Sequence, residues 1–177
     1  MGSRIDRDAS DSAVKRDAPG STKNSDALGS TMKSDALDSA MDRDALTAFL
    51  ATDFAQVADQ FAVEEVTEDG LVLRLVVGEG HLRPGGTVSG PAMFALADVA
   101  VYLTILSRIG PVALAVTTSA TMDFLRRPAA GADLVCRTRL LKLGRSLAVG
   151  DGLILPAAGG EAVARASMTY SIPPSKG

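Results

Sequence analysis

One stretch of this 177-residue chain must form a buried helix, and it contains a single acid. Between Pro91 and Ser107 nearly every residue is apolar, and Asp98 is the only side chain that is charged at neutral pH. A helix that is apolar on every side is expected in the core of a protein. A carboxylate in a core is costly unless it is paired, hydrogen-bonded or used in chemistry. Any account of function must therefore explain Asp98.

The sequence divides into a repetitive tail, residues 1–43, and one compact domain, residues 44–177. The dipeptide Asp-Ala recurs every nine residues, at positions 8–9, 17–18, 26–27, 35–36 and 44–45. The repeats are rich in Ser, Asp, Lys and Ala and have no aromatic residue, so we expect a disordered tail. Met32 and Met41 lie inside the repeats, and the sequence leaves open whether translation starts at Met1, Met32 or Met41.

Composition argues against several classes of protein. The net charge of −3 gives no basic field for nucleic acid or an anionic membrane surface. The single cysteine, Cys136, lies in a strand pattern, and we interpret it as a core residue. The N-terminus lacks an apolar signal-peptide region, and the run Ala92–Leu106 is short for a membrane span. These features predict a soluble cytoplasmic protein.

The domain pattern predicts two strands, one long helix and then four strands, preceded by a short helix. The expected elements are the helix Asp44–Phe54, the strands Phe61–Val66 and Leu71–Val77, the loop His81–Gly90, the central helix Pro91–Arg108, and the strands Val112–Leu125, Ala132–Leu143, Ser146–Leu155 and Ala162–Ile172. Gly90 is the expected N-cap of the central helix, and Gly110-Pro111 should end it. This order predicts an α+β fold with an antiparallel sheet wrapped around the helix. A second subunit should cover what the sheet leaves exposed.

The sequence from Leu82 to Asp98, LRPGGTVSGPAMFALAD, carries the most specific motif. Together with FLRRP at 124–128 and LLKLGRSLAVG at 140–150, it resembles the PaaI-like (phenylacetate-degradation) branch of the hotdog thioesterases, over roughly residues 44–173. The resemblance implies a hotdog fold and hydrolysis of acyl-CoA thioesters at a dimer interface. It also implies that Asp98 is general base or nucleophile, and that the Gly90 amide polarises the thioester carbonyl.

The spacing of these two residues gives an independent argument for a dimer. Gly90 and Asp98 are eight residues apart, which is about 12 Å along a helix. An oxyanion donor and an attacking group must both lie within about 3 Å, or one water, of the same carbonyl. One helix cannot supply both groups, whereas two helices related by a two-fold axis can. We therefore expect a homodimer or homotetramer.

The motif departs from the family pattern at three positions, where Arg83 replaces Asn, Ser89 replaces His and Pro91 replaces Gly. Arg83 is a candidate to bind a carboxylate or a CoA phosphate. Ser89 is a candidate substrate-binding residue, or it simply caps the helix. Pro91 removes one backbone donor near the carbonyl.

Further candidates follow the helix. Thr117 alternates with Ser119, Thr121 and Asp123, and this polar face either lines the pocket or dimer seam or is solvated. Four cations are candidates to bind CoA phosphates, with surface charge as the alternative reading: Arg126, Arg127, Lys142 and Arg145.

Two other functions stay open, a hotdog acyl-CoA or acyl-carrier-protein hydratase-dehydratase and a non-catalytic acyl-CoA-binding protein. A hydratase would pair a histidine with an acid, and His81 is the only histidine. A Ser89–His81–Asp98 triad lacks the G-x-S-x-G elbow. No set of residues has metal-ligand spacing, so we expect neither a metal nor a cofactor.

Overall fold

The structure is a computed structural model that describes residues 40–112, 114–129 and 131–174. The predicted tail lies outside the described residues, apart from its last four positions. The described chain forms a six-stranded antiparallel sheet with the order β1-β2-β4-β5-β6-β3. The strands are β1 (Phe61–Val66), β2 (Leu71–Leu75), β3 (Val116–Phe124), β4 (Leu134–Leu143), β5 (Leu147–Pro156) and β6 (Ala164–Ser171).

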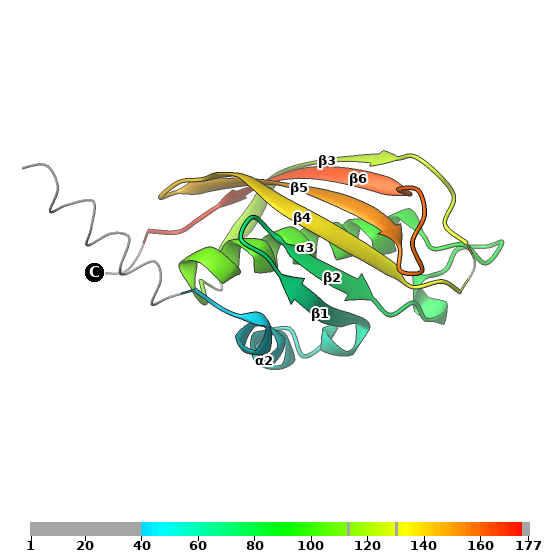
Figure 1. The fold of residues 1–177 in the computed structure, drawn as a ribbon, viewed down its shortest axis with the longest axis horizontal. Coiled ribbons are helices and arrows are strands. Elements are labelled where there is room, and N and C mark those ends of the chain that lie inside the picture. The colour runs from blue at the N-terminus through cyan, green and yellow to red at the C-terminus, as the bar shows by residue number, and fades with distance from the viewer. Residues whose placement is uncertain (1–39, 113, 130, 175–177) are drawn as a thin grey trace, which may run out of the picture.

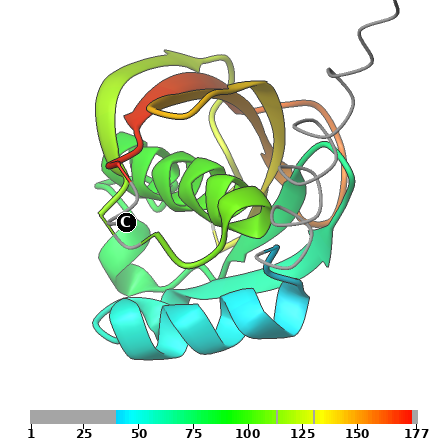
Figure 2. The same cartoon turned by 90° about the vertical axis from the view of Figure 1, so that its left-hand side faces the viewer.

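The sheet curls around one long helix, α3 (Gly90–Ile109), as Figures 1 and 2 show. Two glycines of β5 have no room for a side chain, Gly150 because of the helix and Gly152 because of the neighbouring strand β4. A methyl group added at Gly150 would lie 2.9 Å from Cγ1 of Val101, and one added at Gly152 would lie 2.9 Å from Sγ of Cys136. The predicted α+β hotdog architecture, a curved antiparallel sheet around one central helix, is therefore confirmed.

Helix α3 begins one residue earlier than predicted, and its cap is different. Ser89 is the N-cap, and its hydroxyl accepts a hydrogen bond from the amide of Ala92 at 3.3 Å. The expectation of Gly90 as N-cap was wrong, because a serine oxygen satisfies an orphan amide and glycine has no such group. The predicted end is confirmed, since Gly110 follows the last turn with φ of 82°.

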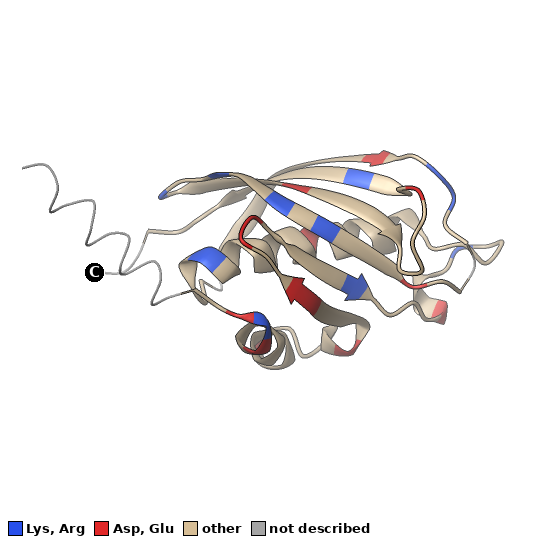
Figure 3. Cartoon of the chain, viewed as in Figure 1, with Lys and Arg blue, Asp and Glu red and all other residues tan. Residues whose placement is uncertain are grey.

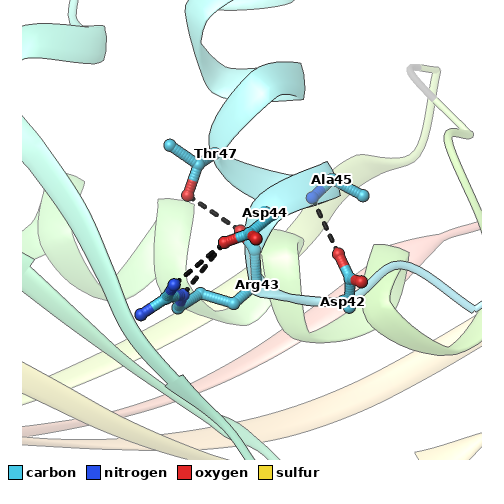
Figure 4. Close-up of polar contacts among 5 residues, drawn as sticks. All are labelled: Asp42, Arg43, Asp44, Ala45 and Thr47. Carbon is cyan, nitrogen blue, oxygen red and sulfur yellow. Dashed lines mark hydrogen bonds and ion pairs between the residues drawn. The ribbon is translucent and has the colours of Figure 1, made fainter.

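A short helix, α2 (Arg43–Asp53), packs against β1 and the underside of α3 (Figure 2). Asp42 caps it by accepting the amide hydrogen of Ala45 at 2.8 Å, and Arg43 pairs with Asp44 beside that cap (Figure 4). Its buried face consists of Leu46, Phe49 and Leu50. The sequence pattern placed this helix one residue too late.

The two halves of α3 differ in burial, which the sequence did not predict. Every residue from Ala100 to Ser107 is buried. In the first half, Phe94 is 40% exposed, Ala95 is exposed and Asp98 is half-buried. The helix is long and apolar enough to cross a membrane, but it is the core helix of this fold and most of it is buried. The described chain thus leaves uncovered one stripe of the first half of α3, which contains Phe94, Ala95 and Asp98.

That stripe lies near strand β3, which forms one edge of the sheet. Most of β3 is exposed, including Val116 at 57% and Phe124 at 56%. The observed strand is shorter than the predicted Val112–Leu125. The predicted β2, β4 and β6 were also too long, and β5 was placed one residue too early, because strand ends depend on ladder partners that sequence patterns do not reveal.

Candidate active site

Asp98 is held by two hydroxyl groups from two different strands. Its Oδ1 accepts a hydrogen bond from Thr117 Oγ1 on β3 at 2.6 Å, and one from the Tyr170 hydroxyl on β6 at 2.6 Å. The Tyr170 hydroxyl also lies 2.8 Å from the backbone oxygen of Asp98. Among the described residues, no hydrogen bond reaches Oδ2. The acid is thus anchored through one oxygen, and the described residues leave the other oxygen without a hydrogen-bond donor.

Asp98 opens into a hollow of about 280 Å³. The hollow is lined by Phe54, Asp98, Val99, Tyr102, Ala115, Val116, Thr117 and Tyr170. The sequence pointed to Asp98 and Thr117 but missed Tyr170 and Phe54. Tyr170 sits at an inward-facing position of an ordinary alternating strand, and Phe54 follows the last turn of α2, so neither has a local sequence signal.

Burial fixes the role of the Tyr170 hydroxyl. Its low exposure and the nearby Asp98 charge raise the pKa of Tyr170 above its ordinary value. The hydroxyl is therefore protonated at all physiological pH values and acts as a donor. The carboxylate is the acceptor in this pair.

An irregularity in β3 separates Thr117 from the other polar residues of that strand. Thr117 pairs with Tyr170 of β6. Ser119 pairs with Thr169, the neighbour of Tyr170 on β6, so Thr118 is an extra residue in the ladder. The side chain of Thr117 consequently points toward Asp98, while the side chain of Ser119 lies on the opposite face of the sheet. The prediction of one shared polar face was wrong, because such a bulge inverts the alternation.

Gly90 lies in a second hollow, of about 480 Å³. This hollow brings together the predicted residues Gly90, Arg83 and Arg127, with the ring of Phe124 beside them. A methyl group added at Gly90 would lie 3.2 Å from Cζ of Phe124. Within the described residues, the Gly90 amide has no hydrogen-bond acceptor. Helix N-termini present such free amides to negative charge.

The cations of the second hollow are not equivalent. Arg126 pairs with Glu161 at 2.8 Å and donates to the backbone oxygen of Ala162 at 3.1 Å. Arg83 and Arg127 have no ion pair with any described residue. Two arginines without an ion pair to any described residue thus line the same hollow as Gly90.

The remaining predicted cations, Lys142 and Arg145, line neither hollow. They flank the β4–β5 turn, which lies at one end of the sheet, whereas the segment after β3 lies at the other end (Figure 1). Figure 3 shows basic residues at both ends. Within one protomer, the structure does not bring Lys142 or Arg145 together with Arg83 and Arg127.

Comparison with known proteins identifies the family of this chain. The model of the thioesterase superfamily matches residues 85–170. A thioesterase-family protein from Silicibacter is 53% identical, with a TM-score of 0.71 over 76% of this chain and 93% of that chain. The chain belongs to the thioesterase superfamily.

Two further structures resemble this thioesterase-superfamily chain. A variant of the phenylacetic acid degradation protein PaaI from Thermus thermophilus is 28% identical, with a TM-score of 0.59 over 67% of this chain and 99% of that chain. Zebrafish thioesterase superfamily member 2 is 19% identical, with a TM-score of 0.68 over 76% of this chain and 100% of that chain, and supports the fold alone. No protein with a curated function matches the sequence.

His81 has a structural role in this superfamily member. Its Nδ1 accepts the amide hydrogen of Gly78 at 2.9 Å, and its Nε2 lies 2.9 Å from Oε1 of Gln60. Both ring nitrogens are used to hold the loop, and the ring lines neither hollow. The buried Cys136 is equally inert, because burial raises the pKa of its thiol to about 12. The described residues contain no group of three or more potential metal ligands.

Proposed function

We propose that this protein is an acyl-CoA thioesterase that hydrolyses acyl-CoA to a free acid and CoA. The observation that carries the proposal is the anchored carboxylate of Asp98 at the wall of the hollow, with one oxygen held by Thr117 and Tyr170 and the other without a hydrogen bond to any described residue. Such a group can take a proton from water or attack a carbonyl directly. In the first route water adds to the carbonyl carbon and the C–S bond breaks. In the second, Asp98 displaces the sulfur to form an acyl–Asp98 anhydride, which water then cleaves to regenerate the carboxylate. In both routes one water is consumed, its hydroxyl ends on the carboxylic acid and its other hydrogen ends on the thiol of CoA.

The Gly90 amide supplies the second requirement, a donor for the developing oxyanion. It lies at the N-terminus of α3, where the helix dipole favours negative charge. In one chain, however, Gly90 and Asp98 open into different hollows. A single protomer therefore has two incomplete halves of one site.

A two-fold dimer that joins the β3 edges would complete the site. An antiparallel pair of β3 strands, with the axis near the middle of the strand, would bring Thr117 beside Phe124 of the partner subunit. Thr117 contacts Asp98, and Phe124 contacts Gly90. The pairing would thus place Asp98 of one subunit near Gly90 of the partner subunit, and it would cover Phe94 and the exposed edge of β3.

The same pairing explains why cations occur at both ends of the sheet. Leu147, Ser171 and Val116 are cross-strand neighbours, so the β4–β5 turn lies at the same end of the sheet as the start of β3. In the dimer, Lys142 and Arg145 would lie near Arg83 and Arg127 of the partner subunit. We propose that these four residues bind the phosphates of CoA in a cytoplasmic enzyme, which needs no metal or cofactor.

Ser89 is the weakest of the proposed substrate contacts, because its hydroxyl already caps α3. The hydratase alternative requires a histidine opposite the acid, and both nitrogens of His81 are used in its own loop. A non-catalytic acyl-CoA-binding protein would not need two donors on one carboxylate oxygen. The geometry therefore favours hydrolysis over both alternatives.

Thiol release from a panel of aromatic and aliphatic acyl-CoAs tests the proposal. We expect turnover of at least one class by the wild-type protein, and loss of that turnover in Asp98→Asn. Binding without thiol release would support the binding-protein alternative. Water addition to an enoyl-CoA would support the hydratase alternative.

A further inference from the structure

We propose that Tyr170 is a positioning residue, which fixes the Asp98 carboxylate so that Oδ2 is the reacting oxygen. This inference rests on the proposed thioesterase function and adds a residue to its site. The Tyr170 hydroxyl is 2.6 Å from Asp98 Oδ1, the same oxygen that Thr117 contacts. The described contacts of the Tyr170 hydroxyl with Asp98 are with Oδ1 and the main-chain oxygen, not with Oδ2, so Tyr170 acts through Asp98.

Two hydrogen-bond donors on one carboxylate oxygen constrain Asp98 differently from one donor on each of its two oxygens. With Thr117 and Tyr170 both bound to Oδ1, rotation of the carboxylate would break two charge-assisted hydrogen bonds at once. Oδ2 keeps its lone pairs for a water molecule or a carbonyl carbon. Catalytic groups must be held close to their productive geometry, and a small displacement lowers the rate strongly.

The contact with the backbone makes the arrangement more rigid. The Tyr170 hydroxyl lies 2.8 Å from the main-chain oxygen of Asp98, in addition to the carboxylate. The phenol therefore touches the helix backbone and the side chain of the same residue. Because the phenol has a single hydrogen, these two acceptors share one donor, and through it Tyr170 links β6 to the turn of α3 that carries Asp98.

The ring of Tyr170 is itself held by other aromatic rings. It stacks on Tyr102 of α3 with centroids 6.1 Å apart and an interplanar angle of 25°. Tyr102 in turn contacts Phe49 at 6.1 Å and Phe54 at 5.5 Å. Phe49 belongs to α2 and Phe54 follows it, so α2 supports the position of Asp98 through this aromatic stack. Helix α2 lies outside the segment that matches the superfamily model.

Tyr170→Phe tests the proposal because it removes the hydroxyl and keeps the ring. We expect kcat to fall about tenfold or more, since the lost hydrogen bond serves the reacting carboxylate. KM should change less than about twofold, because the residue makes no uniform binding contact with substrate. The melting temperature should fall by no more than about 4 °C.

The control is Thr47→Val. This substitution removes an exposed hydroxyl on α2 that donates to the backbone oxygen of Arg43 at 2.8 Å, does not reach Asp98 and lines neither hollow. It should leave kcat and KM unchanged. The rescue variant carries 4-aminophenylalanine at position 170, which keeps the ring and restores a donor. It should recover most of the kcat that Tyr170→Phe loses.

The failure of this inference differs from failure of the proposed function. Wild-type protein without thioesterase activity, or an Asp98→Asn variant with full activity, would contradict the function. If Asp98→Asn is inactive but Tyr170→Phe keeps wild-type kcat, the positioning role is wrong. A rise in KM with unchanged kcat, or a folded 4-amino variant without recovery, would also overturn it.

Discussion

The two halves of α3 are equally apolar in sequence but have different surroundings. The second half, Ala100–Ser107, is buried on all sides by the sheet and α2. The first half has an uncovered stripe that contains Phe94 and Asp98. The chain thus completes its core around one half of the helix and leaves the other half open beside an unpaired strand edge. The hollow of Asp98 and the hollow of Gly90 both border this open region.

The largest effect is expected in the open half. Asp98→Asn should lower kcat by two to four orders of magnitude, the usual range for a positioned acid-base group. Folding should survive, because the amide can still accept hydrogen bonds from Thr117 and Tyr170. Thiol release and thermal melting measure the two effects. The control is Asp44→Asn, which removes a carboxylate that pairs with Arg43 on α2, away from β3 and from both hollows. Equal losses from both variants would refute a specific role for Asp98.

A substitution in the closed half, Ala100–Ser107, should change the stability of the protein and not its chemistry. Leu103 is fully buried, and Leu103→Ala should lower the free energy of unfolding by about 2–5 kcal/mol. The Phe94→Ala substitution in the open half should lower the free energy of unfolding of the isolated protomer much less, but it should weaken subunit association. Urea unfolding and sedimentation at several protein concentrations separate these effects. If Phe94→Ala destabilises as much as Leu103→Ala without changing association, the two halves do not differ as described.

Gly90 allows its amide to be removed with little change in shape. Ser89 has φ of −75° and ψ of 155°, which suits a residue before proline. Proline is tolerated in the first helical turn, so Gly90→Pro should fold. We expect kcat to fall about 10²-fold, as for loss of one oxyanion donor. Gly90→Ala is the matched control, because it adds a Cβ near Phe124 but keeps the amide. A comparable loss of kcat in the alanine variant would mean that crowding, and not the amide, explains the result.

The smallest effect is expected at the β4–β5 turn. Arg145→Ala should raise KM for acyl-CoA a few-fold, by about 1 kcal/mol at most, with little change in kcat. The effect should shrink at high salt, because the attraction between arginine and phosphate is screened. It should vanish with a pantetheine thioester that lacks the nucleotide phosphates. An equal rise in KM for the truncated substrate would exclude a contact between Arg145 and those phosphates.

The fold was largely predictable from the sequence, because apolar periodicity and turn residues mark the order of strands and the long helix. Asp98 and Gly90 were predictable because a lone acid in an apolar helix and a glycine at its start are local features. Tyr170 was not, since it reaches Asp98 from a strand 72 residues later in the chain. The bulge at Thr118 was also hidden, because alternation in the sequence continues through it. The exposed stripe of α3 was not predictable either. It depends on β3 being an edge strand, and the order of strands in the sheet has no local sequence signal.

Subunit mixing tests the composite site most directly. Asp98→Asn and Gly90→Pro homodimers, each inactive or nearly so, are mixed under conditions where subunit exchange is verified by mass spectrometry of differently labelled chains. Random exchange should restore about a quarter of wild-type activity, since half of the dimers are mixed and each has one intact site of two. Mixed dimers without any recovery of thiol release would contradict the account, because Asp98 and Gly90 would then act within the same chain.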